Sequence, residues 1–191
     1  MSAPTPPILD ITARRPQRAD ARRNFDAVLA AAREAFAEHG SDASLEDIAR
    51  RANVGIGTLY RNFPTRQDLL EAVFAGEAQE LCTAAQNVAG LPPWEAFTTW
   101  LDSFARYVPT KVALLEALNK DSEVFRACKS AMVASALPIF ERAQQAGELR
   151  PDVTLDDVLR MVSGMVGSTY VDDAQRERVL GIALDGLRAK R

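Results

Sequence analysis

The stretch "VGIGTLYRNFPTR", residues 54–66, determines how the first third of the chain is interpreted. Glycine costs about 1 kcal/mol relative to alanine inside a helix, yet Gly55 and Gly57 stand at the start of a segment with helical spacing. Leu59 and Phe63 are four residues apart and so share one helix face, and Pro64 ends the segment. The pattern predicts a short helix over residues 56–63 whose first turn carries little side-chain bulk.

Another short helix is expected just before this one. Ser44 and Asp47 have the spacing of a capping box at its start. The residues 53–55 that follow it leave room only for a tight turn. Two short helices joined in this way form a helix-turn-helix, whose second helix lies in the DNA major groove with its N-terminal residues nearest the bases. Glycine at that end lets backbone N–H groups approach phosphate.

The outward side chains of the second short helix suit the same use. A tyrosine hydroxyl or an arginine can bond phosphate, threonine can bond a base or a phosphate, and isoleucine can pack on a thymine methyl group. Arg66, at the start of the next helix, can reach backbone phosphate. The predicted DNA contacts are Ser44, Gly55, Ile56, Gly57, Thr58, Tyr60, Arg61 and Arg66.

This stretch resembles the DNA-binding segment of the TetR family of bacterial repressors. The family pattern is roughly small-Val-x-x-Gly-Thr-Leu-Tyr-x-x-Phe-x-Ser/Thr-Lys/Arg-x-x-Leu, and residues 53–69 here read NVGIGTLYRNFPTRQDL. With the upstream sequence, the resemblance covers about residues 22–75. One departure is Gly55, where the family often has serine at the start of the recognition helix, so the bases that are read can differ.

Helical spacing continues on both sides of this motif. From Asp20, which we expect to cap it, a helix runs to Gly40. We expect Thr65 with Asp68 to cap a long helix. Another helix follows, and we expect Pro109 to end it. We predict an all-α fold of about nine helices: a flexible basic arm (1–20), a three-helix helix-turn-helix head (21–66) and a helical bundle (67–191).

The charge is distributed unevenly along the chain. Residues 1–66 hold ten Lys and Arg against eight Asp and Glu, whereas residues 67–191 hold thirteen against eighteen. A basic front and an acidic back suggest that only the front binds nucleic acid. The arginine-rich arm fits two interpretations, a solvated surface or a segment that follows the minor groove or the phosphates.

The resemblance implies that residues 67–191 bind a small-molecule ligand and form a homodimer, so that the ligand changes the spacing of two DNA-binding heads. An aromatic and methionine-rich set could line a largely apolar pocket, although an aromatic stripe at helical spacing is also what a plain core requires. The predicted ligand-binding residues are Phe97, Trp100, Phe104, Leu118, Met132, Met161 and Met165. Periodicity does not place the polar candidates inside or outside; these are Asp102, Arg106, Glu116, Asn119 and Arg160.

The last two predicted helices carry more apolar surface than one stripe. The first of them carries apolar residues on more than one face, namely Val158, Leu159, Val162, Met165 and Val166, and its small residues Ser163 and Gly167 permit close backbone approach. A helix that is apolar on more than one side must be buried on more than one side. We therefore predict that these helices form the seam of a homodimer.

Other classes of protein fit less well. One histidine, two separated cysteines and no phosphate-binding glycine loop argue against an enzyme, a metal site or a cofactor. The alternative is a helical interaction protein that has lost DNA binding or ligand control. The N-terminus lacks a signal-peptide core and no apolar run reaches about 20 residues, so we expect a cytoplasmic protein that does not enter the membrane. The ligand, the operator, the target genes and the choice between repressor and activator are not encoded in these patterns.

Overall fold

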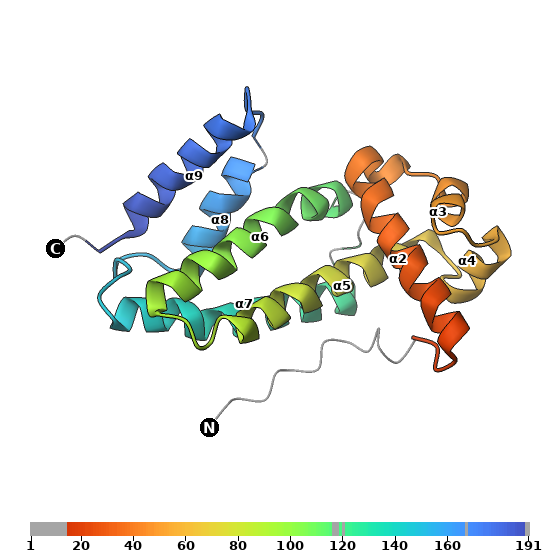
Figure 1. Cartoon of the computed structure of the whole chain (residues 1–191), viewed down its shortest axis with the longest axis horizontal. Helices are drawn as coiled ribbons and strands as arrows, with labels where there is room; N and C mark the ends of the chain where they lie inside the picture. The colour runs from red at the N-terminus through yellow and green to blue at the C-terminus, as the bar shows by residue number, and fades with distance from the viewer. Residues whose placement is uncertain (1–14, 116–118, 120, 167, 190–191) are drawn as a thin grey trace. The chain divides into compact units, whose positions relative to one another are not determined.

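The computed structural model describes residues 15–115, 119, 121–166 and 168–189. Within these residues there are eight α-helices, a short 3-10 helix and no strand (Figure 1). The all-α prediction is confirmed, and the helix count is close to the predicted nine. The elements are α2 (Ala19–His39), η1 (Gly40–Asp42), α3 (Leu45–Arg51), α4 (Ile56–Asn62), α5 (Arg66–Asn87), α6 (Pro93–Leu115), α7 (Glu123–Gln145), α8 (Leu155–Val166) and α9 (Asp173–Leu187).

The chain forms two compact units. Unit 1 comprises Met1–Gln79 and Thr110–Ala131, and unit 2 comprises Glu80–Pro109 and Met132–Arg191. Helices α5, α6 and α7 each contribute residues to both units. The domain limits after residues 20 and 66 remain predictions.

In unit 1 the helices α2, α3 and α4 pack around one small core (Figure 1). Phe25 and Phe36 of α2 are buried, and Ile48 of α3 and Leu59 of α4 are fully buried with them. The rings of Phe25 and Phe63 lie 4.9 Å apart between centroids. These are apolar positions at helical spacing, so the predicted three-helix head has the packing that its sequence pattern requires.

Local side-chain bonds fix most of the helix starts in unit 1. The backbone N–H of Asp47 donates to Ser44 Oγ at 3.3 Å, and the predicted cap of α3 is thereby confirmed. Before α5 the bonds are reciprocal: Thr65 N donates to Asp68 Oδ2 at 3.0 Å, and Asp68 N donates to Thr65 Oγ1 at 3.1 Å. The expected cap at Asp20 is wrong, because α2 begins one residue earlier, at Ala19, and Asp20 lies in its first turn.

The prediction that Pro109 ends a helix is also wrong. Helix α6 continues past this position to Leu115, so residues 110–115 belong to it rather than to a new helix. Proline removes one backbone hydrogen bond and tends to bend a helix, but it does not always end one. Helix α7 likewise contains Pro138.

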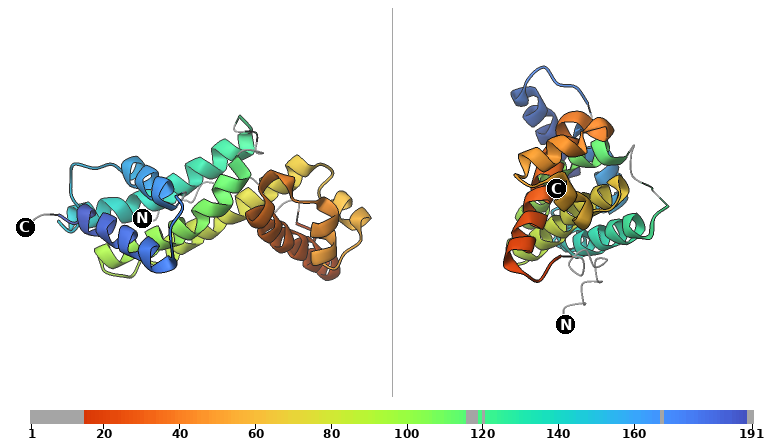
Figure 2. Two further views of the ribbon diagram at one scale, coloured as in Figure 1. Left: turned by 90° about the horizontal axis from the view of Figure 1, so that it is seen from above. Right: turned by 90° about the vertical axis from the view of Figure 1, so that its right-hand side faces the viewer.

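Unit 2 has an aromatic core and an antiparallel pair of helices, α8 and α9 (Figures 1 and 2). The rings of Trp100 and Phe104 stack with centroids 5.8 Å apart. Beyond α9 the chain is tied to the turn after α7, where Ala189 N donates to the carbonyl of Glu148 at 3.0 Å. The Arg188 guanidinium lies 4.3 Å from the centroid of the Trp94 ring. These contacts hold the C-terminal end of α9.

Candidate functional site

The turn between α3 and α4 has a defined backbone geometry. Asn53 adopts a positive φ of 53°, a left-handed conformation that asparagine tolerates better than most residues. Val54 N donates to the carbonyl of Ala49 at 3.0 Å, which closes the turn onto the end of α3. Gly55 then takes the N-cap position of α4 with an extended backbone. The two short helices and this turn form the helix-turn-helix that the spacing predicts.

Helix α4 is anchored on one face only. Leu59 is 0% exposed, and Phe63 just beyond the helix is buried against Phe25. On the outer face Ile56 is 39% exposed and Tyr60 is 45% exposed. Apolar and aromatic side chains exposed together on one helix face can mark a surface that binds another molecule. The outer face of α4 is thus a candidate binding surface.

The two glycines of α4 are not required by the packing of the chain. A Cβ atom added at Gly55 or Gly57 would meet nothing within 4 Å, and neither residue has a positive φ. Neither sterics within unit 1 nor backbone conformation therefore explains glycine here. Space is kept open on the outside of the helix, where a second molecule can approach the backbone closely.

The remaining predicted contact residues occupy different environments. Arg61 is exposed and Thr58 is half-buried. Ser44 is exposed, but its hydroxyl donates to Glu46 Oε2 at 2.9 Å as well as capping α3. The Arg66 side chain is half-buried, with its guanidinium carbon 5.5 Å from the centroid of the Phe36 ring. Arg61 is thus available on the outside of α4, whereas Ser44 and Arg66 already have roles within the chain.

Ion pairing separates two kinds of arginine in unit 1, a distinction that sequence alone does not make. One group is paired: Arg15 with Asp26, Arg23 with Asp20, Arg50 with Asp47, and Arg51 with both Glu38 and Asp47. Hydrogen bonds from Arg51 hold the pKa values of Glu38 and Asp47 below their ordinary range. Within the described part of the chain, Arg18, Arg22 and Arg61 are exposed and have no ion pair. These three supply uncompensated positive charge.

A buried carboxylate on α5 was missed at the level of sequence. Glu77 is 6% exposed and forms an ion pair with Arg33 of α2. The signal was present, because Glu77 lies four residues from both Val73 and Leu81 on the apolar stripe of α5. A charged residue on such a stripe requires a partner on the packed element. The pair ties α2 to the first part of α5 inside unit 1.

The predicted ligand-binding residues fall into three groups. Phe97, Trp100, Phe104 and Met132 are buried, and the Trp100 indole N–H donates to the carbonyl of Leu81 at 3.2 Å. Met161 and Met165 are half-buried. Leu118, like the polar candidate Glu116, lies outside the described residues. The fully buried members have the contacts of a core, which was the alternative that periodicity left open.

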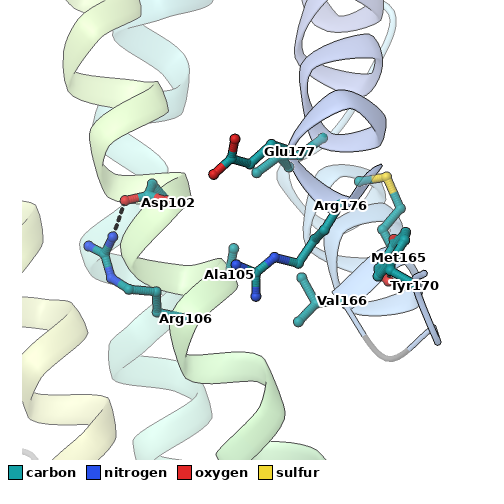
Figure 3. A pocket seen from close by; sticks show the side chains of 9 residues that line it. Asp102, Ala105, Arg106, Met165, Val166, Tyr170, Arg176 and Glu177 are labelled. Carbon is teal, nitrogen blue, oxygen red and sulfur yellow. Dashed lines mark hydrogen bonds and ion pairs between the residues drawn. The ribbon is translucent and has the colours of Figure 1, made fainter. Parts of the chain in front are cut away.

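A pocket of about 440 Å³ lies in unit 2 between α6, α8 and α9 (Figure 3). It is lined by Asp102, Ala105 and Arg106 of α6, Met165 and Val166 of α8, Tyr170, and Arg176, Glu177 and Leu180 of α9. Of the predicted ligand residues it includes Met165. The polar candidates Asp102 and Arg106 pair with each other on its wall. Its size is in the range of small-molecule sites.

The other described polar candidates lie outside this pocket. Arg160 is exposed and pairs with Asp156 at 2.5 Å, and the exposed Asn119 accepts a bond from Asp121 N at 3.0 Å. Across the described ranges, no group of three or more His, Cys, Asp and Glu residues could hold a metal ion. No helix of the described chain is both long enough and apolar enough to cross a membrane.

Two family models match the chain. Residues 28–73 match the model for bacterial regulatory proteins of the tetR family, and residues 92–189 match the model described as "Transcriptional regulator SbtR-like, C-terminal domain". The second match alone covers more than half of the chain. The first match contains α3, the turn and α4.

Solved structures and a curated relative agree with these matches. A TetR transcriptional regulator from Streptomyces coelicolor is 38% identical with a TM-score of 0.74, over 87% of this chain and 99% of that one. A TetR regulatory protein from Mycobacterium vanbaalenii is 32% identical with a TM-score of 0.70, over 91% and 99%. The HTH-type transcriptional repressor KstR of Rhodococcus jostii (strain RHA1) is 32% identical over 100 residues, 52% of this chain. The match spans 45% of that relative's length.

Proposed function

This chain belongs to the TetR family of bacterial transcriptional regulators, and from that premise we propose that it is a ligand-controlled repressor. It binds a palindromic operator as a homodimer, and a small, largely apolar molecule releases it. The repressor assignment is supported by the similarity of 52% of the chain to KstR, a transcriptional repressor. The site of action of such a regulator is the cytoplasm, where DNA is accessible.

The observation that carries the DNA-binding proposal is the outer face of α4. It combines two glycines that the fold does not need with exposed Ile56, Tyr60 and Arg61. In the major groove, Ile56 and Thr58 are placed to contact base edges, while Tyr60 and Arg61 contact phosphate or bases. Open space at Gly55 and Gly57 allows the backbone N–H groups at the start of α4 to approach a phosphate.

The homodimer proposal rests on apolar surface of α8 and α9 that the single chain leaves uncovered. Ile182 of α9 is 72% exposed, and Leu159 of α8 and Val179 of α9 are half-buried. Pairing these surfaces across a two-fold axis would bury them and would supply two copies of α4. Two such helices read half-sites about 34–36 Å apart, or a multiple of that distance, so the operator is expected to be palindromic.

Ligand control requires one element that both sites influence. Helix α5 is continuous from Arg66 to Asn87 and is therefore about 33 Å long. Its first residue follows the DNA-binding motif, and its later residues belong to unit 2. A ligand that binds the DNA-incompetent arrangement tenfold more tightly supplies about 1.4 kcal/mol of coupling, and DNA must then weaken ligand binding by the same factor.

The test begins with selection of genomic fragments that the purified protein retains, followed by footprinting. We expect a protected site with two-fold symmetry, and sedimentation should show a dimer at micromolar concentration. A monomer combined with an asymmetric footprint would reject the homodimer. Absence of any selected fragment, together with no salt-sensitive binding to random duplex, would favour the alternative of an interaction protein without DNA binding.

A further inference from the structure

We infer that the pocket between α6, α8 and α9 is a binding site for an amphipathic cation, a molecule with a flat apolar body and one positively charged end. This inference rests on the ligand response proposed above and specifies its site and ligand class. The location differs from the aromatic stripe of α6, whose members Phe97, Trp100 and Phe104 are fully packed against one another and their neighbours.

The base of the pocket is apolar and adaptable. Met165 and Val166 of α8 and Leu180 of α9 are half-buried, so each keeps some of its surface free to contact a ligand. Tyr170 also lines the pocket, and its hydroxyl donates to the carbonyl of Met165 at 2.6 Å. Its polar atom is satisfied within the chain, which leaves the ring as an apolar contact. A volume of about 440 Å³ matches a drug-sized molecule rather than an ion.

The pocket is lined by two arginines and two acids, so its formal charges balance, but one of the four charged groups is left without a partner. Arg106 is paired with Asp102, and Arg176 is paired with Asp173 at 3.3 Å. The carboxylate of Glu177 has no hydrogen bond or ion pair to any other described residue. Figure 3 shows its carboxylate projecting from α9 toward α6, beside the Arg176 side chain. The unpaired group that faces the pocket is therefore negative.

The chemistry of the occupant follows from this arrangement. An anion would face Glu177 and would have to displace an existing carboxylate from one of the two arginines. A cation pairs with Glu177 without disturbing either pair, while its apolar body covers Met165, Val166 and Leu180. Because Glu177 is exposed, the pair contributes at most about 1 kcal/mol, which corresponds to about fivefold in affinity. Most of the binding free energy then comes from the apolar body.

The experiment uses two fused-ring dyes of similar size and opposite charge, cationic rhodamine 6G and anionic fluorescein. Binding to the full chain is measured by fluorescence anisotropy in the absence of DNA. We expect the wild type to bind rhodamine 6G more tightly than fluorescein. Glu177→Gln should lower rhodamine 6G affinity about fivefold at low salt without weakening fluorescein binding. Val166→Trp fills the pocket and should weaken both dyes.

Glu95→Gln is the matched control, since Glu95 is an exposed acid in the first turn of α6 outside the pocket. It should leave both affinities unchanged. Circular dichroism checks that each variant is folded, and Glu177→Gln is an exposed, isosteric change that keeps the test independent of Val166→Trp. The inference is overturned if rhodamine 6G does not bind, if fluorescein binds as tightly, or if Glu177→Gln and Glu95→Gln behave alike. The dye assay contains no DNA, so its outcome does not depend on whether the protein binds an operator.

Discussion

The outer face of α4 and the pocket of unit 2 both present polar groups beside an apolar surface, but their charges are balanced differently. On α4 and the start of α2, Arg61, Arg18 and Arg22 are exposed without a carboxylate partner within the described chain. In the pocket both arginines are paired and the unpaired group is Glu177. The two surfaces therefore differ in the sign of their unpaired charges, which the number of charged residues alone does not reveal.

The largest expected effect breaks the anchor of the first region. Leu59→Ala should lower the free energy of unfolding by about 3 kcal/mol, because a fully buried leucine leaves a cavity when truncated. Operator binding should be lost with it, because α4 loses its support. Denaturant unfolding measures the change. Leu137→Ala is the control, since Leu137 on α7 is already 40% exposed and should change stability by less than about 0.5 kcal/mol.

The next effect concerns the buried ion pair of unit 1. Arg33→Ala should destabilise the chain by about 1–3 kcal/mol, because Glu77 stays buried without its arginine while Arg33 itself is partly exposed. Arg33→Met combined with Glu77→Leu should recover most of that loss, since an apolar pair avoids the desolvation cost. A double variant as unstable as Arg33→Ala would show that the pair contributes more than mutual neutralisation. Thermal unfolding of the wild type, of Arg33→Ala and of the double variant measures the three stabilities.

A third prediction sharpens the contrast between unpaired and paired arginines. Arg61→Ala should reduce the slope of log affinity against log salt for operator DNA by about 0.9, the effect of one lost phosphate contact. Arg106→Ala, which removes a paired arginine of the pocket, should leave that slope unchanged. If Arg61→Ala instead changes which operator bases are preferred, Arg61 contacts a base and not a phosphate. Anisotropy titrations at several salt concentrations provide both slopes.

The smallest effect compares carboxylates with lowered pKa values in the two units. Hydrogen bonding to Arg51 lowers the pKa of Glu38 from its ordinary 4.5, whereas hydrogen bonds from Thr154 lower that of Asp157 from 3.8. A lowered pKa gives stability that is present above the ordinary value and is lost as pH falls through the lower one. Glu38→Gln should therefore flatten the acid limb of the stability curve slightly. Urea unfolding between about pH 6 and pH 3 measures this.

Ionic strength distinguishes the two causes of a lowered pKa, a charged partner at Glu38 and neutral hydrogen-bond donors at Asp157. The pKa of Glu38 should rise toward its ordinary value at high ionic strength, because its partner is an exposed charge. The pKa of Asp157 should move less, since neutral donors hold it. Equal shifts of the two carboxyl resonances in an NMR titration at low and high salt would contradict this assignment.

Sequence patterns were most informative where interactions are local. The four-residue spacing of Leu59 and Phe63 and the three-residue spacing of Thr65 and Asp68 each specify a contact within one or two helical turns. Both predictions are confirmed for this reason. The predicted DNA contacts themselves remain predictions, because they depend on the shape and sequence of a second molecule.

Contacts between distant segments could not be predicted in the same way. The spacing of the aromatic stripe of α6 favours a core over a pocket but fits both, and only the packing of α6 against other helices distinguishes the two. The partner of Glu77 lies 44 residues away in Arg33, and α6 passes Pro109 although a local rule expected it to stop. The pocket is assembled from α6, α8 and α9, three segments that no single periodic pattern connects.

The turn at Asn53 also bears on the engineering of new operator specificities. Its positive φ and the bond from Val54 N to the Ala49 carbonyl fix the path of the chain from α3 into α4, while the buried Leu59 and Phe63 anchor α4 on the core. Randomised libraries can therefore vary Ile56, Thr58, Tyr60 and Arg61 while Leu59 and Phe63 stay fixed. At position 53 such libraries should admit asparagine, aspartate or glycine and exclude β-branched residues, which strongly resist a positive φ. The helix-turn-helix would then serve as an exchangeable cassette.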